Sequence, residues 1–190
     1  DLERKIIRCG GEANERFEED ALRIMRAVRF SAQLGFTIEE RTKEAIRGHA
    51  DRLRQVSAER IQVELTKLVT SPNPDFLRIA WETGITAVVL PEFDRLMEQP
   101  QNNPHHCFSV GEHTLHAMRA VRPDKCLRLA MLLHDVAKPL CLNTDEAGID
   151  HFHGHAQKGE RIAAQILKRL RYDNHTTELV SRLVKWHDAA

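Results

Sequence analysis

Histidine and aspartate residues that could bind a divalent cation are concentrated in the second half of the chain. Ten of the eleven histidines lie between His105 and His187, and the pair His134-Asp135 directly follows an apolar run at residues 129–133. Burying an imidazole and a carboxylate side by side costs free energy unless they are paired or bind a metal. Both groups donate lone pairs to divalent cations. The pair therefore predicts a metal site.

Three more histidines, His113, His155 and His187, lie on separate predicted helices that could converge on this pair. Any one of them alone is more simply explained as a core or surface residue with a hydrogen-bond partner. Together the five positions favour a cation site, because helical bundles can place ligands from several helices around one centre. Such a site could activate water for attack on phosphorus. Lys138, one turn after the pair, could contact a substrate phosphate.

Four further histidines are open to two interpretations: they could line the pocket of such a site or simply lie on loops, and loops are favoured. They are His105, His106, His151 and His153.

The spacing of apolar residues predicts an all-α fold. Ser109 and Glu112 form a capping box at the start of one helix, and Gly35 is expected to end another. The dipeptide Ile6-Ile7 could form a short strand. The predicted helices are 17–34, one that begins at Thr37, 57–69, 75–81, 109–121, 124–137, 154–171 and 176–188.

A polar, proline-containing segment at residues 99–104 is the best candidate for a linker. It divides the chain into predicted domains 1–98 and 105–190. The first residue is not methionine, so the sequence is expected to be a piece of a longer protein.

Composition indicates a globular protein with no global basic signature for nucleic acid. Hydrophobic residues make up 42% and charged residues 29% of the 190 positions, and 28 Lys and Arg balance 28 Asp and Glu. The four cysteines form no C-x-x-C pair, which favours a reducing cytoplasm. No run approaches the roughly 18 apolar residues of a membrane span, so no membrane association is expected.

Asp20 and Arg23 are three residues apart on the first predicted helix and should share one face of it. The simpler interpretation is an exposed ion pair that contributes little stability. The alternative is that the carboxylate and the guanidinium together read the edge of a nucleobase.

Three motifs in the second half resemble the HD superfamily of metal-dependent phosphohydrolases. They are GEHTL at 111–115, LLHDVAKP at 132–139 and FHGHA at 152–156. The resemblance implies that a divalent metal (Mg, Mn, Ni, Co or Fe) is held by His113, His134, Asp135, His155 and His187. It also implies catalytic roles for His134, Asp135 and Lys138. The family's closing aspartate usually lies on a following helix; Asp188 could substitute for it, or the ligand could lie outside this sequence.

The first half resembles the bacterial tRNA nucleotidyltransferases, which comprise CCA-adding enzymes and their poly(A) polymerase relatives. The similar segments are RFEEDALRIMRAVRFSAQLG at 16–35 and SAERIQVEL at 57–65. The resemblance implies a helical neck and body followed by an HD-type bundle. It implies that Asp20, Arg23, Arg26 and Arg60 bind CTP or ATP, and that the tRNA 3′ end is a partner.

Nucleotide transfer needs a pair of metal-binding carboxylates, and no Asp-x-Asp occurs in residues 1–190. Polymerisation by these residues alone is therefore not expected. In related enzymes the HD module is associated with phosphatase and 2′,3′-cyclic phosphodiesterase activity. Two functions remain open: metal-dependent phosphoester hydrolysis, or a non-catalytic tRNA-binding body with a vestigial metal site.

Overall fold

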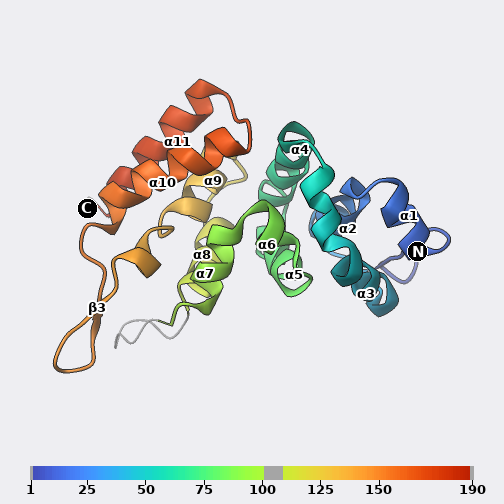
Figure 1. The fold of residues 1–190 in the computed structure, drawn as a ribbon, viewed down its shortest axis with the longest axis horizontal. Coiled ribbons are helices and arrows are strands. Elements are labelled where there is room, and N and C mark those ends of the chain that lie inside the picture. Colours follow the sequence, from blue (N-terminus) through green and yellow to red (C-terminus); the bar gives the residue numbers. More distant parts are fainter. Residues whose placement is uncertain (1, 101–108, 189–190) are drawn as a thin grey trace. The chain divides into compact units, whose positions relative to one another are not determined.

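The structure is a computed structural model of the chain that describes residues 2–100 and 109–188. Its described residues form eleven α-helices, three short 3₁₀ helices and two sheets of two short strands each (Figure 1). The predicted all-α fold class is confirmed. The chain divides into two compact units, Asp1–Pro91 and Glu92–Ala190. Most of the predicted linker lies outside the described residues, as do His105 and His106, and the domain limits 1–98 and 105–190 stay a prediction.

The first unit is built around the packing of α2 on α4. The apolar faces of these two helices bury Ile24, Val28, Leu65 and Leu68, and burial of such side chains is the main stabilising contribution in folding. The elements of this unit are β1 (Ile6–Ile7), α1 (Ala13–Glu19), α2 (Leu22–Leu34), β2 (Thr37–Ile38), α3 (Glu40–His49), η1 (Ala50–Gln55), α4 (Ala58–Val69), η2 (Pro74–Phe76), α5 (Leu77–Glu82) and α6 (Ile85–Val89).

The single helix predicted over residues 17–34 is wrong, because the chain breaks into α1 and α2 at Asp20. Asp20 has an extended backbone with φ −150°, and its carboxylate accepts a hydrogen bond from the backbone N–H of Leu22 at 3.1 Å. A short aspartate side chain often satisfies the backbone in this way and so competes with the helix. Asp20 and Arg23 therefore do not share a helical face.

The helix expected to begin at Thr37 starts later. Thr37 and Ile38 instead form β2, which pairs in parallel with β1, and α3 begins at Glu40. The predicted strand at Ile6-Ile7 is confirmed. Gly35 ends α2 in the left-handed conformation with φ 67°, as the sequence predicts.

The second unit is a helical bundle in which α8 packs on α9, α9 on α11, and α11 on α10 (Figure 1). Ser109 accepts a hydrogen bond from the backbone N–H of Glu112, so its predicted cap is confirmed. The elements are α7 (Pro91–Glu98), α8 (Val110–Ala120), α9 (Lys125–Leu133), η3 (Lys138–Leu140), β3 (Asn143–Thr144), β4 (Asp150–His151), α10 (His155–Arg169) and α11 (Asn174–Trp186).

The predicted helix 124–137 ends four residues early, at Leu133. Residues 134–137 form a tight turn instead, in which the N–H of Val136 donates to the carbonyl of Leu133 and the N–H of Lys138 to that of Asp135. The pair His134-Asp135 thus lies on a turn rather than within a helix. Among the residues that the structure describes, none of the helices has the length and apolar character needed to cross a membrane.

Candidate metal centre

The carboxylate of Asp135 lies at the centre of a cluster of imidazoles in the second unit, where its side chain is only 1% exposed. Its Oδ2 lies 3.2 Å from Nε2 of His134 and 4.0 Å from Nε2 of His113. Its Oδ1 lies 3.5 Å from Nε2 of His155 and 3.6 Å from Nε2 of His187. The structure thus brings together all five residues that the sequence singled out for the site.

Four separate segments position these side chains. His113 lies on the first turn of α8, and the pair His134-Asp135 lies on the turn after α9. His155 is the first residue of α10, and His187 caps the C-terminal end of α11. Because α8 packs on α9, α9 on α11 and α11 on α10, the ends of these helices hold the imidazoles in place.

The orientation of three imidazoles is set by the backbone. Nδ1 of His134, His155 and His187 lies 2.7, 2.8 and 2.6 Å from the carbonyl oxygen of the residue three positions earlier. A carbonyl oxygen accepts only, so each Nδ1 must donate its proton. The neutral ring then has its lone pair on Nε2, the nitrogen that faces Asp135.

The interior of the cluster is rich in acceptors that face one another, and Lys138 is the donor that approaches it, with its ammonium 2.8 Å from Oδ2 of Asp135. Neither carboxylate oxygen of Asp135 accepts a hydrogen bond of ordinary geometry from any described residue. The Nε2 atoms of His155 and His187 lie 3.2 Å apart. Buried polar atoms left without a partner are costly, and a cation among them would satisfy all of these lone pairs. The residues present therefore fit a divalent metal ion.

The possible ligands form two groups that share Asp135. One comprises His113, His134 and Asp135, and the other comprises Asp135, His155 and His187. The ligand atoms within each group lie within 4.8 Å of one another, a spacing that lets a central cation reach each of them.

Burial disfavours the charged forms of both Asp135 and His187. The carboxylate and the imidazole counteract this effect, because each favours the charged form of the other. The pKa of Asp135 lies below its usual range despite burial, because His134, His187 and Lys138 favour the carboxylate. The pKa of His187 is raised despite burial, mainly by Asp135. A proton on His187 and a cation at its Nε2 are thus alternative partners for the same carboxylate.

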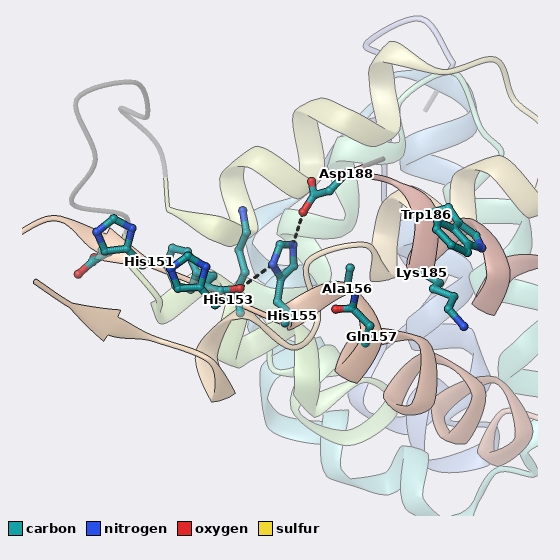
Figure 2. Close-up of a pocket in the computed structure, with 12 residues that line it drawn as sticks. His151, His153, His155, Ala156, Gln157, Lys185, Trp186 and Asp188 are labelled. Atoms are coloured by element: carbon teal, nitrogen blue, oxygen red, sulfur yellow. Dashed lines mark hydrogen bonds and ion pairs between the residues drawn. The ribbon is translucent and has the colours of Figure 1, made fainter. Parts of the chain in front are cut away.

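Two further charged groups border the cluster. The ammonium of Lys138 lies 2.8 Å from Oδ2 of Asp135. The carboxylate of Asp188 lies 3.1 Å from Nε2 of His155 and 3.3 Å from Nε2 of His187, and its side chain is 60% exposed (Figure 2). Lys138 and Asp188 therefore lie at the border of the buried cluster.

Two pockets open beside the cluster and share Lys138 and Asp188. The smaller, of about 330 Å³, includes His113, His134, Asp135 and His187 in its wall. The larger, of about 550 Å³, is lined by His155 and by His151 and His153 (Figure 2). His151 lines this larger pocket from β4, and His153 lines it from the exposed turn before α10; neither lines the smaller pocket, which contains Asp135.

In the first unit, the residues predicted to bind a nucleotide are engaged in ion pairs. Asp20 pairs with Arg60 at 3.0 Å, and Arg23 pairs with Glu19 at 2.7 Å. Burial alone would raise the pKa of Asp20, but the N–H of Leu22 and the guanidinium of Arg60 hold it below its usual range. Asp20 and Arg23 thus have separate partners.

A buried charge pair that the sequence analysis did not single out joins α2 to α4. Nε of Arg29 lies 2.8 Å from Oε2 of Glu64, and both side chains are at most 10% exposed. Arg26 reaches the other oxygen of Glu64 at 3.4 Å. The signal in the sequence was that Arg29 falls on the apolar stripe of its helix, four residues after Met25 and three before Ala32. Arg23 and Arg26 also line a pocket of about 230 Å³.

Comparison with known proteins defines the class to which this fold and site belong. A family model described as "Probable RNA and SrmB- binding site of polymerase A" matches residues 35–97, and the HD domain model matches residues 105–189. The chain therefore carries a polymerase-type RNA-binding segment followed by an HD domain.

Two known proteins and a solved structure are similar to this chain. The CC-adding tRNA nucleotidyltransferase of Thermus thermophilus is 38% identical, and the A-adding tRNA nucleotidyltransferase of Deinococcus radiodurans is 36% identical. Each alignment covers 98% of this chain and 45% of the relative. A crystal structure of the Bacillus stearothermophilus CCA-adding enzyme in complex with CTP matches with a TM-score of 0.54 at 26% identity, over 100% of this chain and 48% of that one.

Over nearly its whole length the chain is similar to tRNA nucleotidyltransferases. It spans somewhat less than half the length of these relatives.

Proposed function

We propose that the second unit is a metal-dependent phosphohydrolase that acts on nucleotide phosphoesters at RNA ends, within a protein of tRNA 3′-end addition and repair. The observation that carries the proposal is the buried carboxylate of Asp135. Its oxygens face the Nε2 lone pairs of the surrounding imidazoles, because backbone carbonyls fix the proton of those rings on Nδ1. An interior this rich in acceptors is suited to a divalent cation.

The cation would be held by His113, His134, Asp135, His155 and His187, and its identity is Mg, Mn, Ni, Co or Fe. When bound, it supplies Lewis-acid activation of water for attack on phosphorus. Lys138 is the residue of this chain that would bind the substrate phosphate. Its ammonium now lies against Asp135, in the wall of both pockets, and contact with a phosphate would exchange one anionic partner for another.

For the first unit we propose a role in binding the incoming CTP or ATP and the tRNA 3′ end. Asp20, Arg23, Arg26 and Arg60 would form the nucleotide-binding surface, a role supported by the similarity of the chain to tRNA nucleotidyltransferases and by the CTP complex of its relative. The carboxylate of Asp20 and the guanidinium of Arg60 already lie together, so one base edge could meet an acceptor and a donor at once.

The test uses 2′,3′-cyclic AMP with purified protein and added Mg²⁺, Mn²⁺, Ni²⁺ or Co²⁺. We expect His134→Ala and Asp135→Ala to abolish metal-dependent hydrolysis, because each removes a ligand from the centre of the cluster. The matched control is His175→Ala, which removes an exposed imidazole from α11 and should leave turnover unchanged. Equal turnover in the wild-type protein and both cluster variants would refute the proposal.

The second candidate function is a non-catalytic tRNA-binding body with a vestigial metal site. The family model for an RNA-binding segment at residues 35–97 supports RNA binding in either case. Elemental analysis separates the two. A protein that holds no metal, gains no activity from added cations and still binds tRNA is expected only for the second function.

A further inference from the structure

The larger pocket beside the metal centre has features that the hydrolysis of a simple phosphate ester would not need. It has a volume of about 550 Å³, within the range of pockets that hold small organic ligands. Lys138, His155 and Asp188 join it to the cluster, and its far wall is formed by Lys185 and Trp186 (Figure 2). A ligand with its phosphate at the cluster would therefore have its remaining part beside Trp186.

Trp186 is a large aromatic side chain held at the surface. Trp186 is 63% exposed, although burying an indole side chain is among the largest apolar contributions to stability. It directly precedes His187, and successive residues near the end of a helix point about 100° apart. The same segment can therefore direct the imidazole into the cluster and the indole along the pocket.

A neighbouring residue places a positive charge beside the indole ring of Trp186. The ammonium of Lys185 lies 5.7 Å from the centre of the indole ring, within cation–π range. Lys185 is itself fixed by an ion pair with Glu160 at 3.2 Å. One side of the indole is thus near a positive charge, and its exposure leaves a flat aromatic surface accessible from the pocket.

The opposite end of the pocket is also aromatic. The rings of His151 and His153 are stacked, with centres 5.6 Å apart and planes 4° apart, and Asp145 binds His151 at 2.8 Å. Figure 2 shows these two rings on the far side of His155 from Trp186. Flat rings at both ends suit a planar ligand. The lining has both signs of charge, Lys138 and Lys185 with Asp150 and Asp188, so the anionic part of the ligand is expected at the cation site.

We propose that this pocket is a nucleobase subsite, in which the base of the terminal nucleotide stacks on Trp186 while its phosphoester lies at the Asp135 cluster. The inference rests on the proposed function in that the cluster is where the phosphoester reacts. Stacking on an aromatic side chain is available to every base, because each has a π face. Trp186 is therefore a specificity residue that selects nucleotides over phosphate esters without a base.

Binding can be measured without turnover. The sequence has two tryptophans, so in a Trp81→Phe background the fluorescence reports on Trp186. We expect AMP to quench this fluorescence and ribose 5-phosphate, at the same concentrations, to leave it unchanged. Equal quenching by both, or none by either, would overturn the subsite.

Kinetics provide the second measurement, in the natural Trp81 background. Trp186→Leu should raise KM for 2′,3′-cyclic AMP by at least about fivefold, the loss expected for one stacked base, with a much smaller change in kcat. Glycerol 1,2-cyclic phosphate, which has no base, should be hydrolysed equally well by both proteins. Trp186→Phe should restore most of the affinity, and Leu179→Ala, at another exposed apolar position on α11, should have no effect.

The two proposals can fail separately. If AMP quenches Trp186 selectively but no cyclic phosphodiester is hydrolysed, the subsite is supported and the hydrolase is refuted. If both substrates are hydrolysed and Trp186→Leu affects them equally, the hydrolase is supported and the subsite is refuted.

Discussion

The histidines of this chain show how one residue type takes different roles through its neighbours. Nδ1 of His49 lies 2.9 Å from a backbone carbonyl, as in the cluster, but Nε2 then faces the exposed carboxylate of Glu18 at 3.6 Å. For His187 the same backbone contact directs Nε2 toward a carboxylate that is 1% exposed and shared by other imidazoles. The buried shared carboxylate, rather than the imidazole itself, distinguishes a candidate ligand.

The first prediction concerns His187. His187→Ala should weaken binding of Mn²⁺ or Ni²⁺ by about tenfold or more, because losing a ligand should cost at least as much as losing a group that merely orients one. Isothermal titration calorimetry measures the change. His175→Ala on the same helix is the control and should bind the cation as the wild-type protein does. If His187→Ala does too, His187 is not a ligand.

At the scale of elements, the contacts of α7 with the rest of the second unit include a close approach and an ion pair. Gly111 on α8 lies so near α7 that an added Cβ would be 2.6 Å from Cα of Met97 and 2.7 Å from its N. Glu92 on α7 binds Arg169, the last residue of α10, through both carboxylate oxygens at 2.5 and 2.8 Å. The spacing of apolar residues along the chain does not predict that α7 contacts α8 and α10.

Gly111→Ala should therefore destabilise the protein by about 1–3 kcal/mol, since the backbone of Met97 would have to move to admit the methyl group. The control is Gly48→Ala on α3, where no heavy atom lies within 4 Å of the new Cβ. That change should stabilise the protein by roughly 0.5–1 kcal/mol, as alanine favours a helix over glycine. Urea unfolding of the two variants measures both values, and a Gly111→Ala protein as stable as the wild type would contradict the close approach.

The pair Glu92–Arg169 predicts a pH dependence. Burial would raise the pKa of Glu92, but Arg169 holds it below its usual value. A lowered pKa in the folded state means that the pair stabilises the protein above the unfolded pKa of glutamate, about 4.3, and that this contribution is lost as the pH falls through the folded value.

Glu92→Gln should thus reduce stability by up to about 1 kcal/mol near pH 7, a size set by the partial exposure of Arg169. The difference from the wild type should shrink when unfolding is measured below about pH 4. The exposed control Glu178→Gln should show a smaller effect at neutral pH. A constant difference for Glu92→Gln across this range would mean that the charge of Glu92 does not contribute.

At the scale of the whole molecule, the two compact units carry different chemistry. The first joins α2 to α4 through the buried pair of Arg29 and Glu64 and holds Arg23 and Arg60 in ion pairs nearer its surface. The second collects residues from α8, α10, α11 and the turn after α9 at one carboxylate. A cation held there would link four segments of one unit and none of the other.

Saturating cation should therefore stabilise the second unit selectively. At a concentration 100 times the dissociation constant the gain is about 2.7 kcal/mol. Thermal unfolding with and without EDTA measures it, and the transition of the first unit should not move. Asp135→Asn, which removes the shared charge, should lose the gain; a shift of the same size in that variant would place the cation elsewhere.

The sequence by itself determined the features that depend on near neighbours. Periodicity gave an all-α chain, Ser109 and Gly35 marked a helix start and a helix end, and Ile6-Ile7 marked a strand, because caps and propensities act within a few residues. The types of residue in the HD motif also identified which imidazoles would meet Asp135.

Only the tertiary structure decided the pairings between distant residues. It paired Asp20, whose local contact with Leu22 ends the first helix, with Arg60, forty positions away. It buried Arg29 against Glu64 and placed Trp186 in a pocket beside His155. These outcomes depend on how helices pack, and packing brings together side chains whose separation along the chain carries no periodic signal.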